Sequence, residues 1–86
     1  MVYFRYEEVG TMKSLHVDGK RIPYEIKNTT VTFHIPGGKK RYVQASELLD
    51  MSDYDIARAK DNGIFSITPN DVRKYIIDTG IDMLFV

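Results

Sequence analysis

Five basic residues follow two predicted turns, and they are the side chains of this sequence best suited to bind a partner. Two of them follow Asp18-Gly19, and three follow Pro36-Gly37-Gly38. In a sheet whose strands pair in chain order these two turns lie at the same end, so the five cations should gather there. Clustered Lys and Arg side chains attract acidic protein surfaces and phosphates. Together with an imidazole and an aromatic ring from the flanking strands, the predicted partner-binding residues are Lys20, Arg21, His34, Lys39, Lys40, Arg41 and Tyr42.

This cluster of cations predicts a small non-enzymatic regulatory or adaptor protein that binds another macromolecule, most of all a protein with an acidic surface. The alternative is a nucleic-acid-binding protein that uses the same hairpins, with or without the helix pair described below. His16 and Tyr24 are expected near the same end. A third interpretation gives the cations no partner, because Lys is common at hairpin tips, where it blocks edge-to-edge aggregation.

The residue types needed for nucleophilic catalysis occur close together at Ser14, His16 and Asp18. A hydroxyl, an imidazole and a carboxylate must converge in a concave site to act together. At this spacing they lie side by side along one face of a strand, and the chain has no cysteine to offer another nucleophile. Gly37 and Gly38 lack the spacing of a phosphate-binding loop. We therefore do not expect an enzyme.

A metal site would have to combine His16, Asp18 and His34. In a meander the strands of the two histidines are separated by a third strand, which places them about 10 Å apart. That separation is long for ligands of one ion. We expect neither a metal nor another cofactor.

The elements that position these residues belong to one small domain, residues 1–86. Apolar residues make up 43% of the chain and charged residues 28%, which is ordinary globular composition. The absence of cysteine fits a reducing compartment, so a cytoplasmic location is expected. The N-terminal charges and the lack of a long apolar run predict no signal peptide and no membrane association. Such a chain resembles many small virus-encoded or accessory regulators.

Charge divides the chain into two halves although its net charge is zero. Residues 1–44 hold eight Lys and Arg against four Asp and Glu, a balance of +4, and residues 45–86 reverse these numbers to −4. A local field of this kind steers a partner more than the total charge does. It also permits head-to-tail self-association, so a monomer or a homodimer is expected.

Residues 1–44, the basic half of the chain, have the sequence pattern of strands. Residues 2–7 alternate with a period of two, and Asp18-Gly19 is a strong hairpin signal between two further strands. Residues 30–35 and 39–44 form a second hairpin around Pro36-Gly37, which suits a type II turn. Pro23 cannot donate a ladder hydrogen bond, which favours an edge or a bulge for its strand.

Residues 45–86, the acidic half of the chain, predict two helices, at about 53–62 and 69–79. Ser52 and Thr68 are predicted N-caps, each followed three residues later by an Asp, and Pro69 suits the first helical position. Gly63 and Gly80 are predicted left-handed C-terminal caps. The closing residues 81–86 are short, apolar and β-prone, so they predict a final strand. Beyond the shared helix-start pattern, no internal repeat is evident in the sequence.

The segment "LLDMSDYDIARAKDNGI", with the second helix that follows it, resembles the helix-extension-helix units of the SAP and Rho N-terminal type over residues of about 46–80. That resemblance implies nucleic-acid binding by the helix pair. The acidic charge of this half opposes binding to phosphates. The alternatives are a helix-turn-helix, a short buried strand at 64–67, or two helices that only pack on the sheet.

The predicted fold is therefore α+β. An N-terminal antiparallel β-meander or small open barrel of about five strands, in residues 1–44, is followed by two short helices that pack on it and a C-terminal strand, in residues 45–86.

Overall fold

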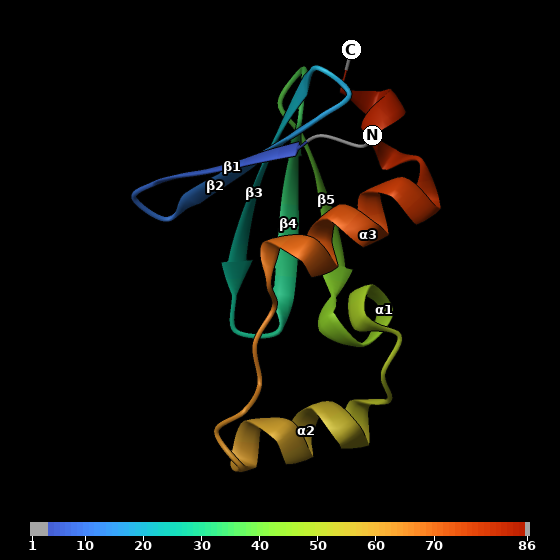
Figure 1. Ribbon diagram of the computed structural model, residues 1–86. Coiled ribbons are helices and arrows are strands. Elements are labelled where there is room, and N and C mark those ends of the chain that lie inside the picture. The colour runs from blue at the N-terminus through green and yellow to red at the C-terminus, as the bar shows by residue number, and fades with distance from the viewer. Residues whose placement is uncertain (1–3, 86) are drawn as a thin grey trace.

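The computed structural model describes residues 4–85, which form an antiparallel sheet followed by helices (Figure 1). The strands are β1 (Phe4–Val9), β2 (Met12–Val17), β3 (Lys20–Lys27), β4 (Thr30–Ile35) and β5 (Lys39–Gln44). The helices are α1 (Ala45–Leu49), α2 (Asp53–Asp61), α3 (Pro69–Thr79) and the 3₁₀ helix η1 (Ile81–Leu84). The α+β prediction is confirmed.

The five strands pair in chain order, each antiparallel to its neighbours, so β1 and β5 are the two edges of an open sheet. The edge or bulge predicted for the strand of Pro23 is wrong, because β3 is the central strand and Pro23 pairs with Ser14 in regular register. Between β2 and β3, Asp18 and Gly19 both have positive φ, 52° and 77°, as the hairpin signal predicts. Gly37 has a φ of 92°, the sign that a type II turn needs at its second central residue. Local turn chemistry thus sets the connections of the meander.

One face of the sheet, which we call the covered face, packs against α3. Cross-strand partners such as Leu15 and Ile22, or Tyr24 and Phe33, place their side chains there and are at most 1% exposed. Each such side chain contributes about 1.5–3 kcal/mol by leaving water. The core is completed by residues of α1, α3 and the C-terminal segment, namely Leu48, Val72, Ile76, Ile81 and Phe85. The opposite face, which we call the open face, is made by the alternate residues.

The predicted helix starts are confirmed in atomic detail. The hydroxyl of Ser52 accepts a hydrogen bond from the amide of Asp55 at 3.1 Å. Thr68 accepts from the amide of Asp71 at 3.2 Å, and the Asp71 carboxylate accepts from the Thr68 amide at 2.9 Å, which completes a capping box. At the other end of α3, Gly80 adopts a φ of 69° and caps the helix as predicted.

The prediction that both helices pack on the sheet is wrong for α2. This helix lies beyond the end of the sheet, below α1 in the view of Figure 1. Ile56 is its one buried residue, and Lys60 ties it to the β3–β4 turn by a 2.6 Å hydrogen bond to Asn28. The reason is visible in its sequence, DYDIARAKD, which has no continuous apolar stripe to bury against a sheet.

The predicted C-terminal strand is also wrong. Residues 81–84 form η1, and Val86 lies outside the described residues. Ile81 and Phe85, four residues apart, are each 5% exposed, whereas Met83 between them is 73% exposed. A strand would have placed all three side chains on one face, so a helical turn is what buries the two that reach the core.

Two further differences concern short segments. Helix α1 was not predicted, because five residues directly after a strand give no periodic pattern. The alternative strand at 64–67 is wrong, since these residues form an extended connection that joins no strand of the described sheet.

Candidate macromolecule-binding surface

The structure brings the two basic turns to one end of the sheet, as predicted, but it divides the predicted residues between the two faces. The β2–β3 and β4–β5 turns lie together at the top of Figure 1, and we call this part of the molecule the basic end. The strand register assigns each residue to a face. Those on the covered face are Lys20, Lys39 and Arg41, and those on the open face are Arg21, His34, Lys40 and Tyr42.

Exposure separates the predicted residues further. Arg21, Lys39, Lys40 and Arg41 are all exposed, and the ring of Tyr42 is exposed over 65% of its surface. A large aromatic side chain left in water beside cations suits contact with another macromolecule, where Tyr and Arg contribute much of the binding energy.

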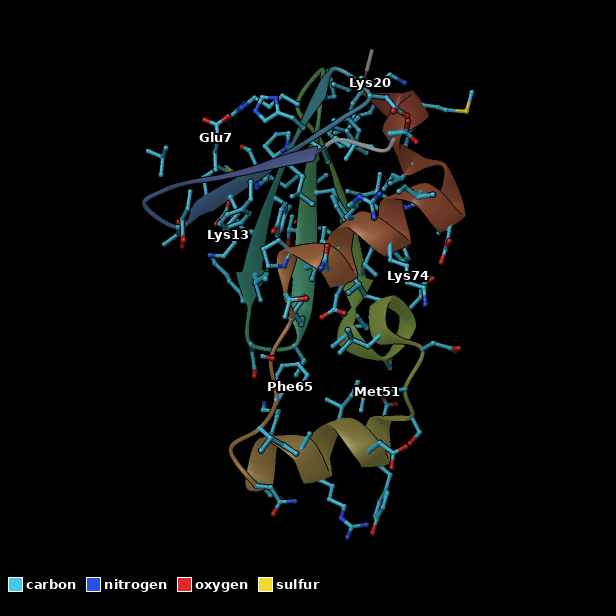
Figure 2. All side chains as sticks on the ribbon, viewed as in Figure 1. Glu7, Lys13, Lys20, Met51, Phe65 and Lys74 are labelled. Atoms are coloured by element: carbon cyan, nitrogen blue, oxygen red, sulfur yellow. The ribbon has the colours of Figure 1, made fainter. Side chains whose placement is uncertain are left out.

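Lys20 is partly withdrawn from this surface. Its ammonium nitrogen lies 3.5 Å from the Asp82 carboxylate of η1, so a cation of the basic half is neutralised by an acid of the other half (Figure 2). Tyr24, expected near the basic end, is instead a core residue that is 1% exposed and packs against Phe33, with ring centroids 6.1 Å apart. Of the two tyrosines expected near the basic end, Tyr24 is therefore buried and Tyr42 is exposed.

Two histidine–glutamate pairs lie on the open face, and the sequence reasoning did not foresee them. Nε2 of His16 lies 2.5 Å from a carboxylate oxygen of Glu7, and Nε2 of His34 lies 2.8 Å from that of Glu25. His16 therefore pairs with a residue of β1, and no hydrogen bond joins its ring to Ser14 or Asp18 within the described residues. The two histidines also stay apart, each bound to its own carboxylate.

The two pairs are related by a repeat that the sequence reasoning missed. In both, the histidine follows its glutamate by nine residues, at the same position of successive hairpins. Directly opposite on the next strand stands a cation, Arg21 for His16 and Lys40 for His34. The twice-repeated spacing of Tyr-Glu and His was the available signal, because it places the same side chains on the same face of β1–β2 and β3–β4.

A shallow cavity of about 130 Å³ opens beside the second pair on the open face. Its wall includes the cation of Lys40, the ring of Tyr42 and the carboxylate of Glu25. Its lining residues are Glu25, Lys27, Thr32, His34, Lys40 and Tyr42. This part of the open face is thus mixed in charge, which suits the mixed polar surface of a protein better than a row of phosphates.

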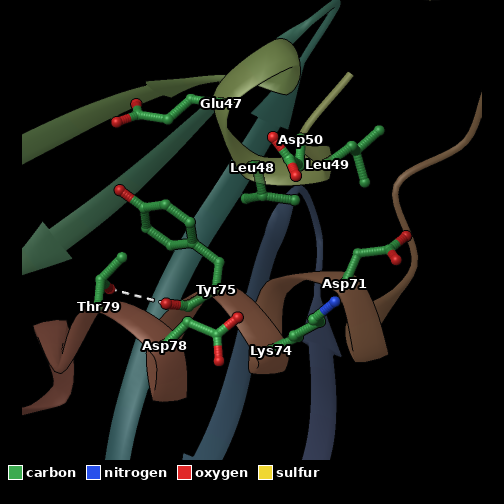
Figure 3. Close-up of a pocket in the computed structure, with 9 residues that line it drawn as sticks. All are labelled: Glu47, Leu48, Leu49, Asp50, Asp71, Lys74, Tyr75, Asp78 and Thr79. Carbon is green, nitrogen blue, oxygen red and sulfur yellow. Dashed lines mark hydrogen bonds between the residues drawn. The ribbon is translucent and has the colours of Figure 1, made fainter.

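A larger groove of about 360 Å³ lies between α1 and α3 (Figure 3). Its lining combines four carboxylates and the ammonium of Lys74 with apolar side chains that include Leu48 and Tyr75. The lining residues are Glu47, Leu48, Leu49, Asp50, Asp71, Lys74, Tyr75, Asp78 and Thr79. The groove went unpredicted because α1, which forms one wall, was itself unpredicted.

Tyr75 connects this groove to the core and to β5. Its ring stacks on Phe33 at a centroid distance of 6.1 Å and an interplanar angle of 13°. Burial raises the pKa of the Tyr75 hydroxyl, the Glu47 carboxylate raises it further, and Arg41 lowers it. The charges of Arg41 on β5 and Glu47 on α1 therefore act on the same phenol.

Within the described residues, no three His, Asp or Glu side chains are placed to hold a metal ion. None of the helices in this part of the chain is long and apolar enough to cross a bilayer. We compared the chain with protein-family models, with curated proteins and with solved structures, and no significant match was found.

Proposed function

We propose that this chain is a small, non-enzymatic regulatory or adaptor protein that binds another protein with an acidic surface through the basic end of its sheet. One observation carries the proposal: the two hairpin turns next to the exposed cations lie at one end of the sheet (Figure 1), and the ring of Tyr42 on β5 is 65% exposed. Cations around an exposed aromatic ring provide electrostatic attraction and contact area on the same surface.

A protein partner is favoured over a nucleic acid by the carboxylates of the open face. Glu7 and Glu25 lie on the same face as Arg21 and Lys40, so a phosphate backbone laid there would meet like charge. The helix pair is also poorly suited, because residues 45–86 carry a balance of −4. Nucleic-acid binding by the hairpins is the second candidate, and it rests on the same cations.

Two double variants test the proposal. Lys40→Ser/Arg41→Ser removes one Lys and one Arg from the basic end, and Arg58→Ser/Lys74→Ser removes the same two charges from the acidic half, where both residues are exposed. Affinity capture from cell extract should retain a partner on the wild type and on the second variant, and lose it on the first. If all three capture the same proteins, the basic end is not the binding surface.

Fluorescence anisotropy with a labelled 20-nucleotide DNA or RNA tests the second candidate. If binding falls steeply with salt and disappears in Lys40→Ser/Arg41→Ser, the partner of the basic end is a nucleic acid and not a protein. We expect no binding at low salt beyond that of the Arg58→Ser/Lys74→Ser control.

A further inference from the structure

The cations of β5 point alternately to the two faces of the sheet. Lys39 and Arg41 belong to the covered face, and Lys40 and Tyr42 to the open face. A partner lying flat on either face would reach one of these pairs and miss the other. All four side chains can be reached together from the outer edge of β5, because a strand added there has neighbours on both faces. We call residues 39–42 the basic edge.

The backbone of the basic edge is accessible. β5 pairs with β4 on one side and ends the sheet on the other. Residues 36–42 are all exposed, and none of residues 39–44 takes part in the backbone hydrogen bonds that join turns, loops and caps in the described chain. In an antiparallel edge strand alternate residues direct their amide and carbonyl groups away from the paired neighbour. β5 thus offers a row of outward-pointing donors and acceptors.

Charge determines which strand can be added at this edge. Two copies of β5 side by side would place Lys39, Lys40 and Arg41 near the same residues of the other copy, and like charges across a strand pair are destabilising. The same three charges attract a strand that carries carboxylates. The basic edge is therefore protected from its own copy and complementary to an acidic segment.

We propose that the basic edge binds an acidic, extended segment of another protein as a sixth strand. This inference rests on the proposed function and adds the mode of binding to it. β5 has six residues, a length of roughly 20 Å at about 3.4 Å per residue, so the segment needs six to eight residues. Backbone hydrogen bonds supply affinity, and successive acidic side chains reach the cations on both faces. Tyr42 then packs against a β-branched neighbour.

The other edge of the same protein is a less suitable occupant. β1 of a second copy is acidic at Glu7 and Glu8, but both carboxylates already have partners within their own chain. Glu7 pairs with His16, and Glu8 lies 3.0 Å from the ammonium of Lys13. Joining β1 to β5 would also repeat head to tail without closing. A separate acidic protein is therefore the occupant that we assign.

The test uses a capped octapeptide with three successive Glu residues at its centre and Val or Thr elsewhere. Two further versions carry N-methyl groups on alternate backbone amides, one at the odd positions and one at the even positions. The charges and the number of methyl groups are the same in both versions. They differ only in which edge of the peptide is blocked, because successive amides point to opposite edges of a strand.

We expect the parent peptide to shift the NMR signals of β5 and to slow hydrogen exchange at alternate β5 amides. One methylated version should bind at least about tenfold more weakly, since three or four hydrogen bonds are lost, and the other should bind within about threefold of the parent. Lys40→Ser/Arg41→Ser should weaken the parent peptide at least about tenfold, and Arg58→Ser/Lys74→Ser should leave it unchanged.

Equal binding of all three peptides would overturn strand addition while leaving the proposed function standing, because a purely ionic contact ignores backbone methylation. If Lys40→Ser/Arg41→Ser binds the peptide and captures proteins as the wild type does, both proposals fail. Sedimentation equilibrium that shows a dimer with β5 amides protected in the absence of peptide would make a second copy the occupant. Displacement of the peptide by DNA at equal concentration would assign the edge to nucleic acid. Either of these results contradicts the inference.

Discussion

The covered and open faces are made of alternate residues of the same strands, yet they differ in exposure and in charge. On β4, Val31 and Phe33 of the covered face are 0% exposed, whereas Thr32 and His34 of the open face stay partly exposed. Their neighbours differ in the same way: Phe33 meets two aromatic rings, and His34 meets a carboxylate and a lysine. Substitutions at adjacent residues of β4 should therefore differ in their effect on stability, which should be large on the covered face and small on the open face.

Among the substitutions that test the difference between the two faces, Phe33→Ala should lower the free energy of unfolding most. Removing a fully buried ring that packs against Tyr24 and Tyr75 should lower the free energy of unfolding by about 3–5 kcal/mol. A chain of this size has roughly 4–13 kcal/mol in total, so the variant should be close to unfolding. Urea denaturation followed by circular dichroism measures the change. Tyr42→Ala on the other face should cost less than about 1 kcal/mol. Equal costs would show that the two faces do not differ as described.

Ile81→Ala and Met83→Ala compare a covered with an exposed position of η1. The first removes a residue that is 5% exposed and should cost about 2–4 kcal/mol, whereas the second removes one that is 73% exposed and should cost less than about 0.5 kcal/mol. Thermal unfolding of both variants provides the measurement. Similar losses at both positions would favour the strand predicted from the sequence, in which residues 81, 83 and 85 share one face.

Raising the pH should lower the free energy of unfolding, because the buried phenol of Tyr24 belongs to the covered face. Burial raises the pKa of this phenol well above 10, so it stays neutral in the folded protein while the unfolded chain ionises. Its contribution is complete below pH 10 and is lost as the pH rises above that value, at up to about 1.4 kcal/mol per pH unit. Urea midpoints of wild type and Tyr24→Phe between pH 9 and 12 measure the difference. Parallel curves for the two proteins would contradict the assignment.

The smallest effects are expected at the helix caps. Thr68→Ala removes half of the α3 capping box and should cost about 1 kcal/mol of global stability, because α3 is packed on the covered face. Ser52→Ala removes the same kind of cap from α2, which buries Ile56 alone, so its effect should be mainly local. Hydrogen exchange should show faster exchange in α2 in the second variant with the rest of the chain unchanged. A matching global loss would mean that α2 folds cooperatively with the sheet.

Most of the sheet could be predicted because its signals are local. The alternation of Val31, Phe33 and Ile35 and the turn at Pro36-Gly37 require no knowledge of distant residues, and β4 and β5 were predicted at their observed bounds. Helix caps are local for the same reason. By contrast, the structure of residues 81–85 depends on where Ile81 and Phe85 meet the core, which no local pattern specifies.

The candidate binding surface was predictable in composition more than in arrangement. The cations and Tyr42 could be found from residue type and from their distance to the turns. The alternation within β5 already separates Lys39 and Arg41 from Lys40, but only the packing of α3 shows which of these faces is covered. The histidine–glutamate pairs were missed because their spacing becomes meaningful only when β1 lies beside β2, and β3 beside β4, in register.

The sequence by itself determined the five strands, their turns, the starts of α2 and α3 and the charge of each half, because these follow from backbone propensities and from side chains a few residues apart. Tertiary structure decided what required distant segments to meet. It covered one face of the sheet, left α2 outside the core, paired Lys20 with Asp82 and left β5 as an exposed edge. Those outcomes depend on which apolar surfaces can be buried together, and that is a property of the whole chain.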